Sequence, residues 1–240
     1  MISRNLFQCG HAGETMGSIR EELLEIYGRR ATNRYGLSDV TQLQHALQTA
    51  TNAEAAGEPP AIIIACLLHD VGHMIHDLGE DFLERGDDDT HEARGAAWIA
   101  QRFAADVSEP VRLHVPAKRY LCAVEGHFEK LAKDSRRSLE LQGGPMSPEE
   151  VAAYRREAFA DAAVRVRRYC DASKNPRATT PPFEHFATPW CVANGLPVDA
   201  ELRARRLAIN AVIRPGRFQH RRQTLFLIFA FDDPERSLAT

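Results

Sequence analysis

The sequence predicts an all-α protein. Apolar residues recur at helical spacing along most of the chain, and prolines and capping residues stand where such segments begin. A short β-prone apolar run lies near the C-terminal end. With 240 residues, 44% of them hydrophobic and 26% charged, the chain has the size and composition of one globular domain with a short appendage.

Three helices are expected in the first third of the chain. Apolar spacing predicts a helix over residues 15–30, and the sequence TNRYGLSD then provides a break in which Ser38 or Asp39 is the candidate N-cap. The sequence VTQLQHALQTATNAEAAG predicts a second helix that ends at Gly57. The prolines of EPP fit the first turn of a third helix, AIIIACLLHDVGHMI, which is apolar nearly all round and is therefore expected to be buried at the centre.

Loops and helices are expected to alternate in the later segments. Residues 77–90 predict an acidic loop, His91 is expected to open a helix, and Pro116 is expected in the first turn of a helix over PAKRYLCAVEGHFEKL. The sequence SLELQGGPMS is expected to be a loop. A Ser-x-x-Glu capping box then predicts one long helix over SPEEVAAYRREAFADAAVRVRRYCDAS.

Two regions of different character are expected, a helical domain over residues 15–195 and a tail over residues 196–240. The tail is first basic and then contains the β-prone run TLFLIFAF. A packed terminal strand, an oligomer contact and an exposed aggregation-prone segment stay open as three interpretations, so the structure of the tail is uncertain.

Charge and cysteine usage restrict the class of protein. The formal net charge of −3 gives no indication of a nucleic acid or a membrane surface as partner. The five cysteines are odd in number and lack CxxC spacing, which indicates reduced thiols rather than a disulfide scaffold. No apolar run reaches transmembrane length, and the N-terminal residues lack a signal-peptide h-region. We therefore expect a cytoplasmic protein with no nucleic-acid or membrane partner and of unknown oligomeric state.

The sequence LLHDVGH carries the main chemical indication. His69 and Asp70 are adjacent at the end of an apolar helix, and His73 follows one helical turn later. Burying a carboxylate beside an imidazole is costly unless a partner such as a metal ion offsets the desolvation. Histidines supply nitrogen ligands and one carboxylate can bridge two metals, so a dinuclear site is predicted from six residues: His45, His69, Asp70, His91, His114 and Asp171.

A single helical histidine is more often a hydrogen-bonded core or surface residue than a metal ligand. This reading applies to His45 and His114 when each is taken alone. It is also our interpretation of the five remaining histidines, which are His11, His76, His127, His185 and His220.

The order His, His-Asp, His, His and a distant Asp resembles the HD-domain superfamily, whose members are helical bundles that hold one or two metals. The sequences YGLSDVTQLQHALQTA, LLHDVGH, THE, HVPAKRYL, SLELQGGPM and RRYCD resemble one branch more closely. This branch contains the mixed-valent diiron oxygenases of phosphonate catabolism, such as the glycine-forming 2-amino-1-hydroxyethylphosphonate dioxygenase and its glycine-betaine-forming trimethylammonio counterpart. The resemblance covers roughly residues 21–189 and excludes the tail.

The resemblance implies an O2-dependent enzyme with two iron ions in a mixed-valent Fe(II)/Fe(III) state. One iron would be held by His45, His69, Asp70 and Asp171. Asp70 would bridge to the second iron, which would also bind His91 and His114.

Substrate contacts follow from the same resemblance. Tyr35 would occupy the second iron until substrate displaces it, and His73 and Lys118 would bind the phosphonate. The three residues that fall near the remaining phosphonate contacts are Ser135, Ser138 and Arg168. A phosphonate dianion suits these side chains, because lysine, arginine, histidine and hydroxyl groups donate hydrogen bonds to it.

The implied reaction cleaves the carbon–phosphorus bond of a 1-hydroxyphosphonate, a small-molecule substrate. Ser38 stands where the glycine-forming enzyme has a glutamate for the primary ammonium, and Tyr35 and Asp39 are nearby. This favours (R)-1-hydroxy-2-(trimethylammonio)ethylphosphonate, giving glycine betaine and phosphate, over 2-amino-1-hydroxyethylphosphonate, giving glycine and phosphate.

Two alternatives stay open. A metal-dependent phosphohydrolase could use the same His-Asp cage with Mn, Mg or Zn to activate water on a phosphate ester or nucleotide. It would need no loop tyrosine, so Tyr35 counts against it. An inactive HD module that binds a nucleotide or a partner protein would have no need of six ligand residues.

Overall fold

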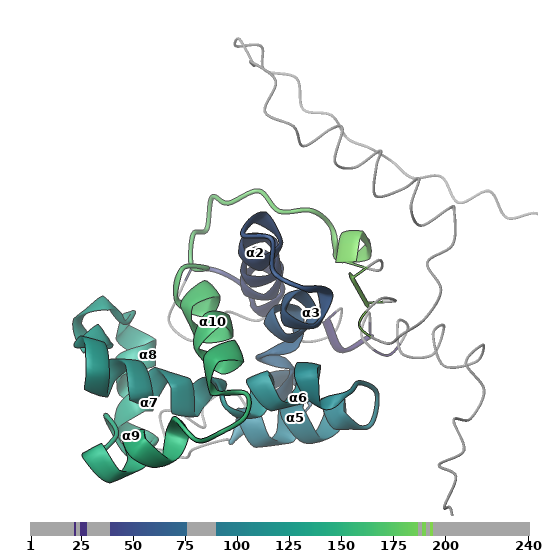
Figure 1. Ribbon diagram of the computed structural model, residues 1–240. Coiled ribbons are helices and arrows are strands. Elements are labelled where there is room, and N and C mark those ends of the chain that lie inside the picture. The colour runs from purple at the N-terminus through teal and green to yellow at the C-terminus, as the bar shows by residue number, and fades with distance from the viewer. Residues whose placement is uncertain are drawn as a thin grey trace, which may run out of the picture.

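The computed structural model describes residues 22, 25–27, 39–75, 90–186, 189, 190 and 193. These residues form helices and connecting turns and contain no strand, which confirms the all-α prediction (Figure 1). The predicted acidic loop, except for Thr90, and the predicted tail lie outside the described residues. The elements are α2 (Gln42–Ala55), α3 (Pro60–Leu68), η1 (Val71–Met74), α5 (His91–Ala100), α6 (Ala105–Arg112), α7 (His114–Glu125), η2 (His127–Lys130), α8 (Lys133–Leu141), α9 (Pro148–Tyr154), α10 (Ala160–Asp171) and η3 (Phe183–Phe186).

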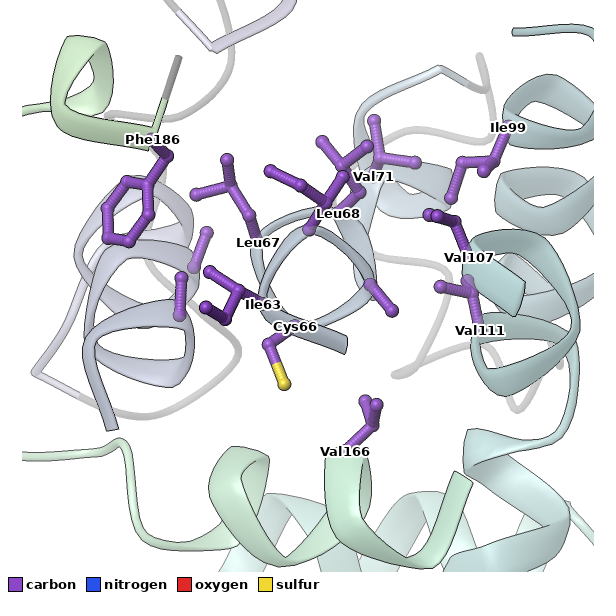
Figure 2. Close-up of a cluster of buried hydrophobic side chains, with 14 of the residues drawn as sticks. Ile63, Cys66, Leu67, Leu68, Val71, Ile99, Val107, Val111, Val166 and Phe186 are labelled. Carbon is purple, nitrogen blue, oxygen red and sulfur yellow. The ribbon is translucent and has the colours of Figure 1, made fainter. Parts of the chain in front are cut away.

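Helix α3 lies at the centre of the bundle, as its apolar sequence predicts. It packs against α2, α6 and α10, and α10 also contacts α7. Figure 2 shows the side chains of α3 packed among those of other elements, with Val166 of α10 on the side of Cys66 and Val107 of α6 on the side of Leu68. The end of α3 is therefore held in the interior, where polar groups need partners.

Local sequence explains where the first helices begin and end. Helix α2 begins after Thr41, whose side chain accepts from the backbone N–H of Gln44 in a capping box, so the N-cap is neither Ser38 nor Asp39. The predicted stop at Gly57 is confirmed, since this residue adopts a φ of +76° just after α2. The prolines begin α3 as predicted, with Pro60 in the first turn.

The prediction that the central helix continues to His73 is wrong. Helix α3 ends at Leu68, and a turn at His69 and Asp70 leads into η1. Close packing between η1 and α5 is the reason: a Cβ atom at Gly72 would lie only 1.9 Å from the carbonyl oxygen of His91. The turn thus brings the backbone of η1 directly against the start of α5.

Three predictions for the later segments are also wrong. The helix expected over PAKRYLCAVEGHFEKL ends at Glu125, because Gly126 adopts a φ of +58° before the short helix η2. The expected loop SLELQGGPMS is partly helical, because α8 continues to Leu141 before Gly143 and Gly144 adopt positive φ angles. The expected long helix is two helices, although its capping box at Ser147 is confirmed. The chain breaks after Tyr154, whose buried hydroxyl donates to the carbonyl of Ala160 across the connection between α9 and α10.

Helix α6 was not predicted, because its sequence ADVSEPVR is short, polar and contains a proline. Its buried residues Val107 and Val111 are one helical turn apart and face the core.

In the described part of the chain, no helix has both the length and the apolar character needed to cross a membrane.

Candidate metal centre

Five of the six predicted ligand residues meet in the interior. His45 comes from the middle of α2, and His69 and Asp70 form the turn after α3. His91 and His114 are the first residues of α5 and α7. All five side chains are buried, and His45 and His69 are completely inaccessible. Residues far apart in the sequence therefore converge on one point, as a ligand set requires.

The two oxygens of Asp70 face two separate groups of nitrogen atoms. Oδ2 lies 3.5 Å from Nε2 of His45 and 3.2 Å from Nε2 of His69. Oδ1 lies 3.7 Å from Nε2 of His91 and 3.5 Å from Nε2 of His114. One carboxylate thus stands between two pairs of imidazoles, which is the arrangement of a carboxylate that bridges two metal ions.

Backbone carbonyls fix the tautomers of three of these histidines. Nδ1 of His45 lies 2.7 Å from the carbonyl of Ser173, Nδ1 of His69 lies 2.8 Å from that of Cys66, and Nδ1 of His114 lies 2.7 Å from that of Val111. A carbonyl only accepts hydrogen bonds, so each Nδ1 carries a proton and Nε2 is the nitrogen that each ring can offer to a metal ion. The orientation of metal-binding histidines in proteins is fixed in the same way.

The Nε2 atoms within each imidazole pair face each other. Nε2 of His45 is 3.1 Å from Nε2 of His69, and Nε2 of His91 is 3.3 Å from Nε2 of His114. Two ligand atoms bound to one metal at about 2.0–2.1 Å and at right angles lie about 3 Å apart. Since Nδ1 of both His45 and His69 carries a proton, two neutral rings would bring their Nε2 lone pairs together, so this pair needs a cation between its nitrogens, either a proton or a metal ion.

Electrostatics in the cluster indicate the same need for a cation. Burial opposes charge on His69, but Asp70 and Cys170 outweigh it and raise the pKa of this imidazole well above its usual range. Burial also opposes the charge on Asp70, yet His69 and His114 hold the pKa of the carboxyl well below its usual range. Oδ2 of Asp70 is nonetheless buried without a hydrogen-bond donor among the described residues. The imidazole nitrogens and this carboxylate oxygen are therefore suited to bind metal ions.

The sixth predicted ligand, Asp171, is not part of this cluster. Both of its carboxylate oxygens accept from Arg167, and Oδ2 also lies 2.9 Å from Nε2 of His127. The preceding residue is in the cluster instead: Sγ of Cys170 lies 3.5 Å from Nε2 of His45. Helix α10 therefore turns the thiol, and not the predicted carboxylate, toward the histidines.

Two groups of three donors have the spacing of a metal site. His45, His69 and Cys170 form one group, and Asp70, His73 and His91 form the other, with donor atoms within 4.8 Å of one another in each. The ring of His73 also stacks on that of His91, with centroids 3.8 Å apart. The predicted phosphonate ligand His73 thus lies at the edge of the second group.

A group of cations and hydroxyls adjoins the histidines, with Lys118 and Ser135 buried and Lys174 and Ser138 half-buried. Lys118 is one helical turn after His114, is 2% exposed, and donates from Nζ to Oγ of Ser138 at 2.9 Å. Lys174 donates to Oγ of Ser135 at 2.8 Å. Burial and the charge of Arg167 lower the pKa of Lys118 to about 7. Three predicted phosphonate contacts, Lys118, Ser135 and Ser138, are thus brought together.

The other predicted substrate contacts are placed elsewhere. Arg168 lies on the surface, half exposed, and donates to Glu125 at 2.6 Å. Asp39 is exposed before α2, while Tyr35 and Ser38 lie outside the described residues. Arg167, which the sequence did not indicate as a site residue, is 3% exposed and close enough to Lys118 to influence its pKa.

One sequence signal could have identified the inward face of α10. One face of this helix carries residues that are all buried and recur every three to four positions: Ala160, Ala163, Arg167 and Cys170.

Two histidines that were interpreted as structural, His127 and His185, pair with Asp171 and Glu54.

Comparison with known proteins agrees with this geometry. Residues 43–159 match the sequence model of the HD domain. The chain is 40% identical over 172 residues to the glycine-betaine-forming [1-hydroxy-2-(trimethylamino)ethyl]phosphonate dioxygenase of Leisingera caerulea, covering 71% of this chain and 88% of the relative. It is also 40% identical over 179 residues to the hydroxymethylphosphonate dioxygenase of Gimesia maris, covering 73% of this chain and 88% of the relative.

Proposed function

This chain belongs to the HD-domain family of phosphonate dioxygenases, and from that premise we propose that it uses O2 to cleave the carbon–phosphorus bond of a 1-hydroxyphosphonate. The observation that carries the proposal is the position of Asp70, with one oxygen facing each of two imidazole pairs. A second feature supports it, because Lys118 and Ser138 lie beside this centre and suit a phosphonate group.

We propose that the centre holds two iron ions, one ferrous and one ferric. His45, His69 and Oδ2 of Asp70 would hold the first, and Oδ1 of Asp70, His91 and His114 would hold the second. When bound, the irons would supply the redox chemistry with O2 and would act as Lewis acids toward the substrate oxygens. The carbonyls that accept from the histidine Nδ1 atoms keep the Nε2 donors aimed at these positions.

The phosphonate would be bound by this cationic group. Lys118 and Lys174 each already donate to a serine hydroxyl, so ammonium and hydroxyl donors are held at fixed positions. Arg167 is buried on the same side, and we propose it as a further contact in place of Arg168, which pairs with Glu125 at the surface. His73, at the edge of the second imidazole pair, would complete the set.

The substrate we propose is (R)-1-hydroxy-2-(trimethylammonio)ethylphosphonate. The glycine-betaine-forming relative supports it, and so does Ser38, since a quaternary ammonium needs no carboxylate to accept an N–H bond. Hydroxymethylphosphonate is a second candidate, because a relative of the same identity is named for that substrate. The primary-amine analogue, 2-amino-1-hydroxyethylphosphonate, is expected to react more slowly.

The experiment is a paired measurement of O2 consumption and phosphate release on iron-loaded protein with each of these three phosphonates. Converting a 1-hydroxyphosphonate to a carboxylate and phosphate consumes one O2 per phosphate, so both rates should be equal. Glycine betaine should form from the trimethylammonio substrate with the highest kcat/KM. A phosphate monoester and an anaerobic reaction are the controls. Phosphate release from the ester would instead indicate the phosphohydrolase alternative, and phosphate release from a phosphonate without O2 would contradict the O2-dependent reaction.

A further inference from the structure

We propose that the thiolate of Cys170, and not the carboxylate of Asp171, is the ligand that α10 supplies to the metal ion held by His45 and His69. The inference deepens the proposed function and rests on it, because that function requires a metal at this position. It replaces an oxygen donor by a sulfur donor in one half of the centre.

The geometry of the α10 terminus carries the inference. Sγ of Cys170 lies 3.5 Å from Nε2 of His45, and its distances to the donor atoms of His45 and His69 are all within 4.8 Å. One turn later in the chain, the carbonyl of Ser173 lies 2.7 Å from Nδ1 of the same His45 ring. The end of α10 thus orients the imidazole on one side and places the thiol beside its lone pair on the other.

Asp70 provides the second, independent observation. Its Oδ2 atom is buried, has no hydrogen-bond donor among the described residues, and faces His45 and His69 at 3.5 and 3.2 Å. The two Nε2 atoms are thus approached by Sγ of Cys170 and by this carboxylate oxygen. Imidazole nitrogen, carboxylate oxygen and cysteine thiolate are each established ligands of transition metals in proteins.

Asp171 is already engaged in another interaction. Both of its oxygens accept from Arg167, and Oδ2 lies 2.9 Å from Nε2 of His127. To bind the metal, the carboxylate would have to leave these partners, and Arg167 would then be a buried cation that has lost its ion pair. Asp171 therefore positions Arg167 at the cationic group, and Cys170 faces the metal.

Binding through Cys170 releases a proton. The S–H bond breaks as the sulfur–metal bond forms, and the proton leaves to solvent, so no oxidant or reductant is needed. A thiolate also donates more electron density than a carboxylate, which distinguishes the first metal position from the second, where the histidines and Oδ1 of Asp70 are the donors.

The test is anaerobic loading of the full chain with Co(II), followed by absorption spectroscopy. A cysteine thiolate bound to Co(II) produces an intense near-ultraviolet charge-transfer band that nitrogen and oxygen ligands do not produce. We expect this band in the unmodified protein and its loss in Cys170→Ser. Cys122→Ser is the matched control, because Cys122 is also buried and free but packs in a different cluster around α7 and α8. It should keep the band.

Three further variants address folding and ligand identity. Cys170→Asp offers an oxygen donor at the same position, so it should bind two metal ions without the sulfur band. Cys170→Ala should bind one of the two ions at least about tenfold more weakly in a chelator titration, since even indirect partners of metal ligands contribute 10–100-fold. Asp171→Asn should keep the band and both ions.

The outcomes separate this inference from the proposed function. Two bound Co(II) ions without the band in the unmodified protein would overturn the Cys170 assignment and leave the proposed centre intact. A band that persists in Cys170→Ser, or metal loss in Asp171→Asn equal to that in Cys170→Ala, would also overturn it. A protein that binds no Co(II) would overturn both.

Discussion

Lys118 keeps an amino group in the protein interior, 2% exposed and hydrogen-bonded to Ser138. Burying an ammonium is unfavourable unless a negative partner is present, and a bound phosphonate would be that partner. Lys118 therefore has a clear role in the proposed site, and without a bound anion its burial would be unfavourable.

The first prediction is that Lys118→Ala leaves the metal content unchanged and raises KM for the phosphonate about ten- to a hundredfold. One charge-assisted hydrogen bond contributes about 1.5–3 kcal/mol, which corresponds to this range. Steady-state kinetics and elemental analysis measure both quantities. Arg168→Ala is the control: its side chain pairs with Glu125 at the surface, so KM should not change. Loss of iron in Lys118→Ala with unchanged KM would contradict the assignment.

The second prediction concerns pH. The pKa of Lys118 is lowered to about 7, so its ammonium form predominates below that pH and is lost above it. An anion binds the ammonium form more tightly, and phosphonate affinity should therefore fall as the pH rises from 7 to 9. Arginine keeps its charge throughout, so Lys118→Arg should flatten this decline.

Calorimetric titration of both proteins over one pH series measures the effect. The ionisation of the phosphonate itself is common to both proteins and cancels in their ratio. A parallel decline in the two proteins would show that Lys118 does not titrate in this range.

At the scale of single elements, the sequence was informative where a local rule decides the structure. The capping box at Ser147, the prolines of α3 and the glycine after α2 are short-range signals, and the corresponding helix ends were predictable. The end of α3 was not predictable from the sequence. It depends on the contact between Gly72 and the backbone of His91, which lies 19 residues later in the chain. Such contacts belong to the tertiary structure.

Helix α10 shows how much a single residue matters. Consecutive residues of an α-helix are rotated by about 100°, so adjacent positions point to different surroundings. The predicted Asp171 and Arg168 are each one position after Cys170 and Arg167, which the structure turns inward. The pattern of His and Asp residues indicated a ligand on this helix, but only the helix face decides which side chain meets His45.

The third prediction tests the contact between η1 and α5. A Cβ atom at Gly72 would lie 1.9 Å from the carbonyl oxygen of His91, so Gly72→Ala must push the start of α5 away from Asp70. We expect a loss of about 1–3 kcal/mol in the free energy of unfolding, as for other overpacked sites. Metal affinity should fall as well, because His91 moves relative to the bridging carboxylate.

Gly57→Ala provides the comparison for Gly72→Ala. Gly57 has open space around it but a φ of +76°, so alanine there costs stability through backbone strain, at the end of α2 and away from the metal ligands. Denaturant unfolding and metal titration of both variants separate the two effects. Equal metal affinities in the two variants would mean that the η1–α5 contact does not hold His91 in place.

At the scale of the whole molecule, the centre joins elements that are distant in the sequence. Donor atoms come from α2, the turn after α3, α5, α7 and α10, and each of these helices also packs in the bundle. The unfolded chain cannot hold these donors together. Metal ions therefore bind the folded state selectively and should stabilise it.

The fourth prediction is that metal raises the stability of the unmodified protein but not that of Asp70→Ala. At a free metal concentration of about 100 times Kd, binding at one site contributes about 2.7 kcal/mol to the free energy of unfolding. Both ions depend on Asp70, because Oδ2 faces one imidazole pair and Oδ1 the other, so its removal should abolish both contributions together. His114→Ala, which removes a donor from only one pair, should retain roughly half of the metal-induced rise in stability.

Thermal melts with and without Fe(II) under argon, together with elemental analysis, provide the measurement. Two ions per chain in Asp70→Ala would show that the imidazole pairs hold metal without a bridge, and the two halves of the centre would then be independent sites.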